Sequence, residues 1–232
     1  MRQSLCAVLL AVSAVGCIAQ STHPTGGPPE VSFQFERVGL AVPKFALVVQ
    51  EDGNGTYKAE TAPVSSASYG ANAGTAGAGQ LIDRTIKLSA ATTDLIFKTA
   101  RSLEYFNIPC ESKAKNIANT GKKTLSYTGT DGHGSCLYNY SDNKSVTQLT
   151  DIFQAIAFTL DEGRKLDFLH RFDRLGLYAE MDTLRREVEA KRALELGNIT
   201  KSLTSIANDE ALMQRVREKA AALLNEAEPD AK

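Results

Sequence analysis

The chain has 232 residues, of which 43% are hydrophobic and 23% charged, an ordinary composition for a globular protein with one good core or two small ones. Its formal net charge is −1, so no overall positive field recruits nucleic acid or an anionic membrane surface. We therefore expect no nucleic-acid partner.

The first 19 residues have the pattern of a signal peptide. Arg2 supplies a positive charge, and residues 5–15 are apolar but too short for a membrane span of about 20 residues. Ala19 is a small residue suited to cleavage by signal peptidase. The alternative is a lipoprotein signal in which Cys17 carries the lipid. Both predict export from a bacterial cell to the periplasm or the exterior, with a lipid as the only membrane anchor.

The cysteines predict one disulfide. Cys6 and Cys17 lie in the signal segment, which leaves Cys110 and Cys136 as an even pair in an exported chain. A bond between them closes a loop of about 25 residues and contributes roughly 3 kcal/mol by restricting the unfolded chain. A redox-active or nucleophilic thiol is the alternative, but the sequence contains no Cys-x-x-Cys motif.

Strands dominate the first part of the mature chain. Residues 20–30 are rich in Pro, Gly and Thr and predict a flexible tether. Alternating or continuous apolar patterns then mark residues 31–38, 45–49, 56–60, 84–88, 123–129 and 135–140. Residues 62–80 are mostly Ser, Ala and Gly, which predicts a disordered loop within the domain.

Two amphipathic helices accompany these strands. Thr92 or Thr93 can cap the first helix, and the capping box from Ser145 to Gln148 can begin the second, which we expect to end at Gly163. Each helix has one apolar face. We expect both to lie on one face of an antiparallel sheet of about five strands, giving an α+β domain over residues 31–163.

Beyond Gly163 the patterns predict only helices. A short helix is expected over residues 167–175, and further apolar faces occur within residues 177–188, 199–207 and 212–223. Asn208 or Asp209 can cap the last helix. These elements predict a helical C-terminal extension over residues 164–228 that packs against the sheet domain.

The central hairpin carries the candidate ligand surface. Asp131 and His133 lie in its turn, and Tyr138 and Tyr140 lie on its second strand. The competing interpretation is an aromatic core wall beside Cys136, with a solvated turn. No catalytic residue is assigned, because no nucleophile elbow occurs, and the spacing of the three histidines predicts no metal or cofactor.

A Tyr-Asn-Tyr-Ser segment at residues 138–141, together with the paired cysteines, resembles small bacterial envelope domains of unknown function. The resemblance covers roughly residues 31–175 and transfers no functional residue. We expect a non-catalytic binding or structural module whose partner is an envelope protein or a ligand. The alternatives are a secreted hydrolase with a site near residues 131–138, and an inhibitor or assembly factor whose loop at residues 62–80 orders on contact.

Overall fold

The computed structural model of the chain describes residues 27–63 and 79–227. The predicted signal peptide with Cys17, most of the predicted tether, and residues 64–78 of the predicted loop lie outside this part. Among the helices that are described, none combines the length and the apolar character needed to cross a membrane.

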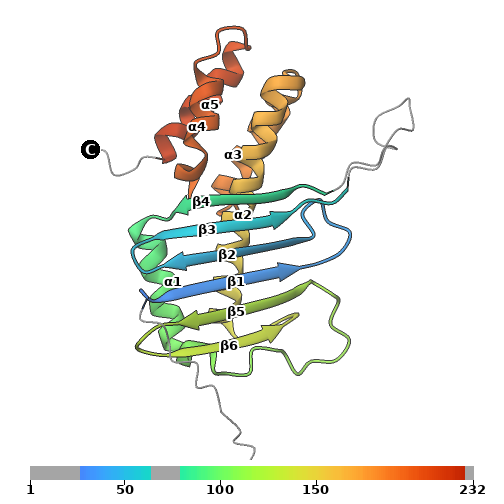
Figure 1. Cartoon of the computed structure of the whole chain (residues 1–232). Coiled ribbons are helices and arrows are strands. Elements are labelled where there is room, and N and C mark those ends of the chain that lie inside the picture. The colour runs from blue at the N-terminus through green and yellow to red at the C-terminus, as the bar shows by residue number, and fades with distance from the viewer. Residues whose placement is uncertain (1–26, 64–78, 228–232) are drawn as a thin grey trace, which may run out of the picture.

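Six strands form one antiparallel sheet in the order β4-β3-β2-β1-β5-β6 (Figure 1). They are β1 (Glu30–Glu36), β2 (Lys44–Gln50), β3 (Asn54–Glu60), β4 (Leu81–Lys87), β5 (Lys122–Thr128) and β6 (His133–Tyr138). Each of the six segments with a strand pattern contributes one strand, so the expectation of about five was one too low. The α+β class is confirmed.

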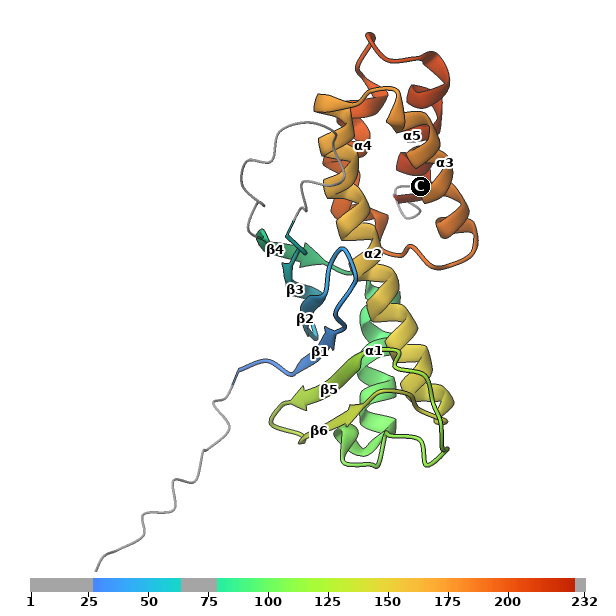
Figure 2. The same cartoon turned by 90° about the vertical axis from the view of Figure 1, so that its right-hand side faces the viewer.

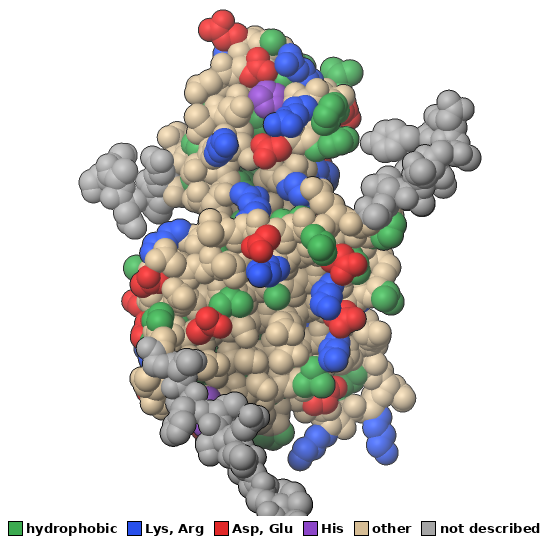
Figure 3. All heavy atoms as spheres, in the orientation of Figure 1, with side chains coloured by type: hydrophobic (Ala, Val, Ile, Leu, Met, Phe, Trp, Pro, Cys, Tyr) green, Lys and Arg blue, Asp and Glu red, His purple; other side chains and the backbone are tan. Residues whose placement is uncertain are grey.

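The alternation along each strand separates the sheet into two different faces. The inner face is buried and carries large apolar side chains, such as Phe33, Leu47 and Leu125. The outer face is not covered by any helix in the described part of the chain, and its middle shows mainly backbone and side chains that are neither hydrophobic nor charged (Figure 3). Burial of one face alone explains the period-two pattern of the sequence.

Helices α1 (Ala90–Ser102) and α2 (Lys144–Phe172) cover the inner face (Figure 2). Their caps differ from the expected ones. Ser89 caps α1 by accepting a hydrogen bond from the Thr92 backbone N–H, and Asn143 caps α2. Both side chains precede the expected caps and satisfy free N–H groups of the first turn, so Thr92, Thr93 and Ser145 lie inside the helices.

The predicted end of the second helix at Gly163 is wrong, because α2 continues to Phe172 and includes residues 167–172 of the predicted short helix. Gly163 lies inside α2, where it packs closely against Ile199. A β-carbon at this position would lie 2.4 Å from the Ile199 Cγ2 atom and 3.0 Å from its Cβ atom. Gly163 therefore allows the segment around Ile199 to approach the α2 backbone.

The C-terminal extension packs on the second half of α2, beyond the β4 edge of the sheet (Figure 1). Its elements are α3 (Gly176–Glu189), the short η3 (Leu196–Ile199), α4 (Thr200–Ala207) and α5 (Gln214–Ala227). Neither Asn208 nor Asp209 caps the last helix as predicted, since α5 begins at Gln214 and the Asp209 carboxylate instead accepts a hydrogen bond from the Ala211 N–H.

Two hydrophobic cores meet along α2. The first core lies between the sheet and the helices and includes Phe153, whose ring stacks on that of Phe33 with centroids 5.2 Å apart. The second core lies within the extension and includes Leu166 and Leu203. Helix α2 contributes to both cores, and the change from one core to the other falls within this helix, between Leu160 and Leu166.

Two polar side chains fasten the extension to the sheet. The Asn198 amide accepts a hydrogen bond from the Lys87 N–H at 2.8 Å and donates one to the Lys87 carbonyl at 2.9 Å. The Glu195 carboxylate accepts hydrogen bonds from the Ser89 N–H and hydroxyl, each at 2.8 Å. Asn198 thereby pairs part of the β4 edge, which would otherwise expose unpaired backbone groups.

Candidate functional site

The predicted disulfide between Cys110 and Cys136 is present. The two Cα atoms lie 5.8 Å apart, within the usual range for this bond, and both residues are buried. The bond ties the segment that follows α1 to β6, an edge strand. Its role in the structure is that of a buried covalent link and not that of an exposed thiol.

The candidate ligand surface on the hairpin does not form one surface. Tyr138 is buried on the inner face beside Cys136, and its hydroxyl lies 2.6 Å from the Thr150 hydroxyl. Tyr140 follows the end of β6 and is partly exposed, whereas His133 begins the same strand and is exposed. Tyr138 therefore belongs to the aromatic core wall and is not available to a ligand.

Asp131 is held in a structural network at the hairpin turn. Its carboxylate accepts hydrogen bonds from the Tyr127 hydroxyl at 2.7 Å and from the Arg101 Nε at 2.9 Å. Arg101 also pairs with Glu51 at 2.7 Å. Burial favours the neutral acid, but the hydrogen bonds from Tyr127 and Arg101 prevail and lower the pKa of Asp131. This network fastens the hairpin turn to α1, and it does not place a nucleophile next to a base.

A cavity of about 480 Å³ lies where the sheet meets the helical extension. We call it the junction cavity. Strands β3 and β4, helices α2 and α4, and η3 contribute to its wall. His170 lines the cavity, and the charged side chains in its lining are Arg84, Arg164, Arg171, Lys201, Asp161 and Asp167.

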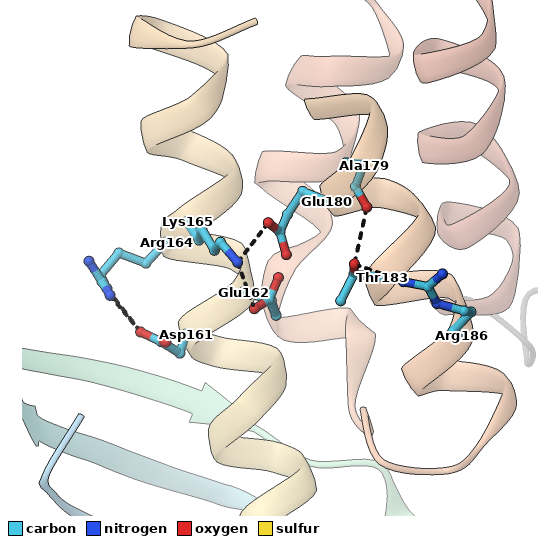
Figure 4. Close-up of polar contacts among 8 residues, drawn as sticks. All are labelled: Asp161, Glu162, Arg164, Lys165, Ala179, Glu180, Thr183 and Arg186. Carbon is cyan, nitrogen blue, oxygen red and sulfur yellow. Dashed lines mark hydrogen bonds and ion pairs between the residues drawn. The ribbon is translucent and has the colours of Figure 1, made fainter. Parts of the chain in front are cut away.

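Positive charge exceeds negative charge in this lining, with four cations against two carboxylates. Asp161 is engaged by Arg164, whose Nη2 atom lies 2.7 Å from the carboxylate (Figure 4). Arg171 and Lys201 form no ion pair with any residue of the described chain. The cavity is therefore a polar site with a local positive excess, in a chain whose overall charge is close to neutral.

Arg84 enters the cavity wall from the inner face of the sheet. Its neighbours on the same face of β4 are Ile82 and Ile86. The guanidinium donates only long hydrogen bonds, at 3.4 Å to the Leu160 carbonyl and 3.3 Å to the Asn198 carbonyl. No carboxylate of the described residues pairs with it, so much of its donor capacity faces the cavity.

The hydroxyl groups of two buried residues also belong to the lining. Tyr57 is 2% exposed and Ser202 is 7% exposed, and neither hydroxyl forms a hydrogen bond within the described part of the chain. Burial raises the pKa of Tyr57, and the negative charge of Asp161 raises it further. Tyr57 therefore remains a neutral phenol that can donate a hydrogen bond into the cavity.

His170 lies on the wall of the cavity and is fixed by a carboxylate behind it. Its Nε2 atom lies 2.8 Å from the Asp209 Oδ2 atom, and Arg174 approaches the same oxygen at 3.5 Å. The hydrogen bonds from His170 and from the Ala211 N–H lower the pKa of Asp209. This contact joins the end of α2 to the turn after α4.

A pair of carboxyl groups lies between α2 and α3. Glu162 and Glu180 point toward one another, with the Lys165 ammonium 2.6 Å from Glu180 and 3.8 Å from Glu162 (Figure 4). Burial raises the pKa of Glu162 to about 8, and the neighbouring Glu180 contributes to the rise. Hydrogen bonds from Glu162 and Lys165 lower the pKa of Glu180 against the effect of burial. Burial and the neighbouring carboxylate thus favour the protonated form of Glu162.

The carboxyl pair is an internal contact between α2 and α3 and does not line the junction cavity.

Within the described residues, no group of three or more His, Cys, Asp or Glu side chains could hold a metal ion. The sequence matches no protein-family model, and a comparison with curated proteins finds no match.

The junction cavity could not be predicted from the sequence, because its residues come from distant segments. Arg84, Arg164 and Lys201 are far apart along the chain, and no local pattern joins them. One signal was present. In the alternating run Ile82-Asp-Arg84-Thr-Ile86, the arginine occupies the same face as two isoleucines. A charged residue at an inward position needs a partner or a cavity, and so it marks a candidate site.

Proposed function

We propose that this is an exported bacterial protein that acts as a non-catalytic binding or structural module in the periplasm or at the cell surface. The observation that carries the proposal is the buried disulfide between Cys110 and Cys136. Disulfides persist in oxidising compartments and are rare in the bacterial cytoplasm. The signal-like pattern at residues 1–19 supports the same location.

The junction cavity supports a binding role. Its volume of about 480 Å³ falls within the range of small-molecule sites, and several fixed polar groups converge on it. The hairpin residues considered for a hydrolase give less support to catalysis, because Tyr138 faces the core and Asp131 is engaged by Tyr127 and Arg101. The proposed partner is a small ligand or an envelope protein, and not a nucleic acid.

Mass spectrometry of the native protein, taken from its own cells, tests the location. We expect a mature chain that begins after Ala19, or a chain that begins at Cys17 and carries a lipid. We also expect the peptides that contain Cys110 and Cys136 to be linked unless a reductant is added. A full-length chain with both thiols free would contradict export.

A Cys17→Ser variant separates the two exported forms. If the mature protein carries a lipid, this variant leaves the membrane fraction and loses the lipid mass. If the signal is cleaved after Ala19, the variant behaves like the wild type in fractionation. Either result is compatible with export and decides how the protein is retained in the envelope.

A further inference from the structure

We infer that the junction cavity binds a small organic oxyanion, whose phosphate or carboxylate group lies against the guanidinium groups of Arg84 and Arg164. The inference rests on the proposed binding function and adds the chemical class of the ligand. It does not depend on the compartment in which the protein works.

The wall of the cavity carries an excess of positive charge. Four cations and two carboxylates line the cavity, and one of the carboxylates, Asp161, is already paired with Arg164. Arg171 and Lys201 have no acidic partner among the described residues. An anion placed here gains attraction from several directions in a partly enclosed space, where charges interact more strongly than in open water.

Arg84 lacks close hydrogen-bond acceptors. A half-buried guanidinium with only two long hydrogen bonds to carbonyl oxygens is poorly satisfied, because ordinary N–H···O distances are about 2.9 Å. A planar guanidinium matches carboxylate and phosphate oxygens in a two-bond arrangement. An oxyanion would supply the acceptors that Arg84 lacks in the described structure.

The size of the cavity and its uncharged polar groups favour an organic ligand. The cavity of about 480 Å³ is much larger than one phosphate ion, so the ligand should carry further atoms beside its charged group. Tyr57 and Ser202 are buried residues that line the cavity, and their hydroxyls have no hydrogen-bond partner among the described residues, which suits hydroxyl or carbonyl groups of the ligand. The class that fits is an organic anion with additional polar groups.

Calorimetric titration of the purified, oxidised protein tests the inference. The probes are inorganic phosphate, pyrophosphate and citrate, each at low ionic strength. We expect saturable binding of at least one probe, weakened by added salt and accompanied by a higher melting temperature. Binding of the phosphates alone would identify a phosphate ligand, and binding of citrate alone a carboxylate ligand. No saturable binding of any probe would overturn the inference.

Variants locate the site. Arg84→Gln and Lys201→Gln should each weaken binding, the first by about tenfold or more because it removes a charge-assisted contact. Ser205→Phe fills the cavity without changing its charge and should also weaken binding. Since Arg84 contacts two backbone carbonyls, the melting temperature of each variant is measured to establish that it is folded.

Lys113→Gln serves as the control, because Lys113 is an exposed lysine outside the cavity. It should bind the probe as the wild type does. If all three cavity variants bind normally, or if Lys113→Gln weakens binding as much as they do, the anion lies elsewhere and the inference fails. None of these outcomes depends on export, which the mass of the native protein tests separately.

Discussion

Gly163 decides how closely the extension packs on the long helix. A glycine inside a helix normally costs about 1 kcal/mol relative to alanine. Here a side chain would collide with Ile199, whose Cγ2 atom lies 2.4 Å from the position of an added β-carbon. The close contact therefore outweighs the poor helix propensity of glycine.

We expect Gly163→Ala to lower the free energy of unfolding by about 1–3 kcal/mol, because overpacking shifts the segment around Ile199. Urea denaturation measures the change. Gly197→Ala is the matched control, since no heavy atom lies within 4 Å of an added β-carbon at Gly197. Equal stability of the two variants would show that the close contact at Gly163 is unimportant.

The protonated Glu162 makes stability depend on pH. Its pKa rises from 4.5 to about 8 in the folded chain, chiefly through burial. Between these values the folded protein keeps a proton that the unfolded chain has released. The resulting stabilisation is complete below the unfolded pKa and is lost as the pH rises through the folded pKa.

Glu162→Gln should remove this dependence, because glutamine resembles the protonated acid and does not titrate. We expect the variant to gain stability relative to the wild type as the pH rises from about 5 to about 9, by an amount on the order of 2 kcal/mol. Urea denaturation at both pH values measures it. Glu189→Gln, on the exposed face of α3, should keep the wild-type slope. A slope unchanged in Glu162→Gln would mean that Glu162 is ionised in the folded state.

At the scale of elements, the disulfide holds β6 to the segment that follows α1. Cys110 and Cys136 are 26 residues apart, and the bond reduces the freedom of the unfolded chain. We expect the double variant Cys110→Ala/Cys136→Ala to lose about 3 kcal/mol of stability. Thermal unfolding with and without a reductant measures this. The reductant should destabilise the wild type and leave the variant unchanged, and a wild type insensitive to reduction would count against the structural role.

Asn198 protects the free edge of β4 by pairing with the Lys87 backbone. We expect Asn198→Ala to lower stability by about 1 kcal/mol and to speed hydrogen exchange of the Lys87 amide. Asn208→Ala, which alters an exposed asparagine at the end of α4, should change neither quantity. Unchanged exchange at Lys87 in the first variant would show that the edge is protected by other contacts.

Local patterns predicted the elements well and their ends poorly. Alternating or continuous apolar patterns marked the segments of all six strands, although we expected a sheet of about five. The predicted N-caps, Thr92 or Thr93 and Ser145, were wrong. Ser89 and Asn143 lie nearby and are equally suitable capping residues, and the sequence alone does not show which residue of each group begins the helix. Gly163 was interpreted as a stop because its packing partner, Ile199, lies 36 residues (199 minus 163) further along the chain.

At the scale of the whole molecule, the junction cavity depends on how the two cores are joined. The sequence predicted a boundary between the α+β domain and the helical extension after residue 163. Helix α2 runs across this position and contributes to both cores, and so it fixes the extension relative to the sheet. The junction cavity exists only because of this arrangement. Its residues could not be grouped from sequence, since β4, α2 and α4 meet only in the folded chain.

Hydrogen exchange under native conditions, followed by mass spectrometry, tests most directly that the sheet and the extension form one unit through α2. We expect the α2 amides on both sides of Gly163 to exchange with similar free energies, close to those of the central strand β1. Much faster exchange throughout residues 164–227, with the sheet still protected, would contradict this. It would show an extension that opens independently and a junction cavity that is not a fixed site.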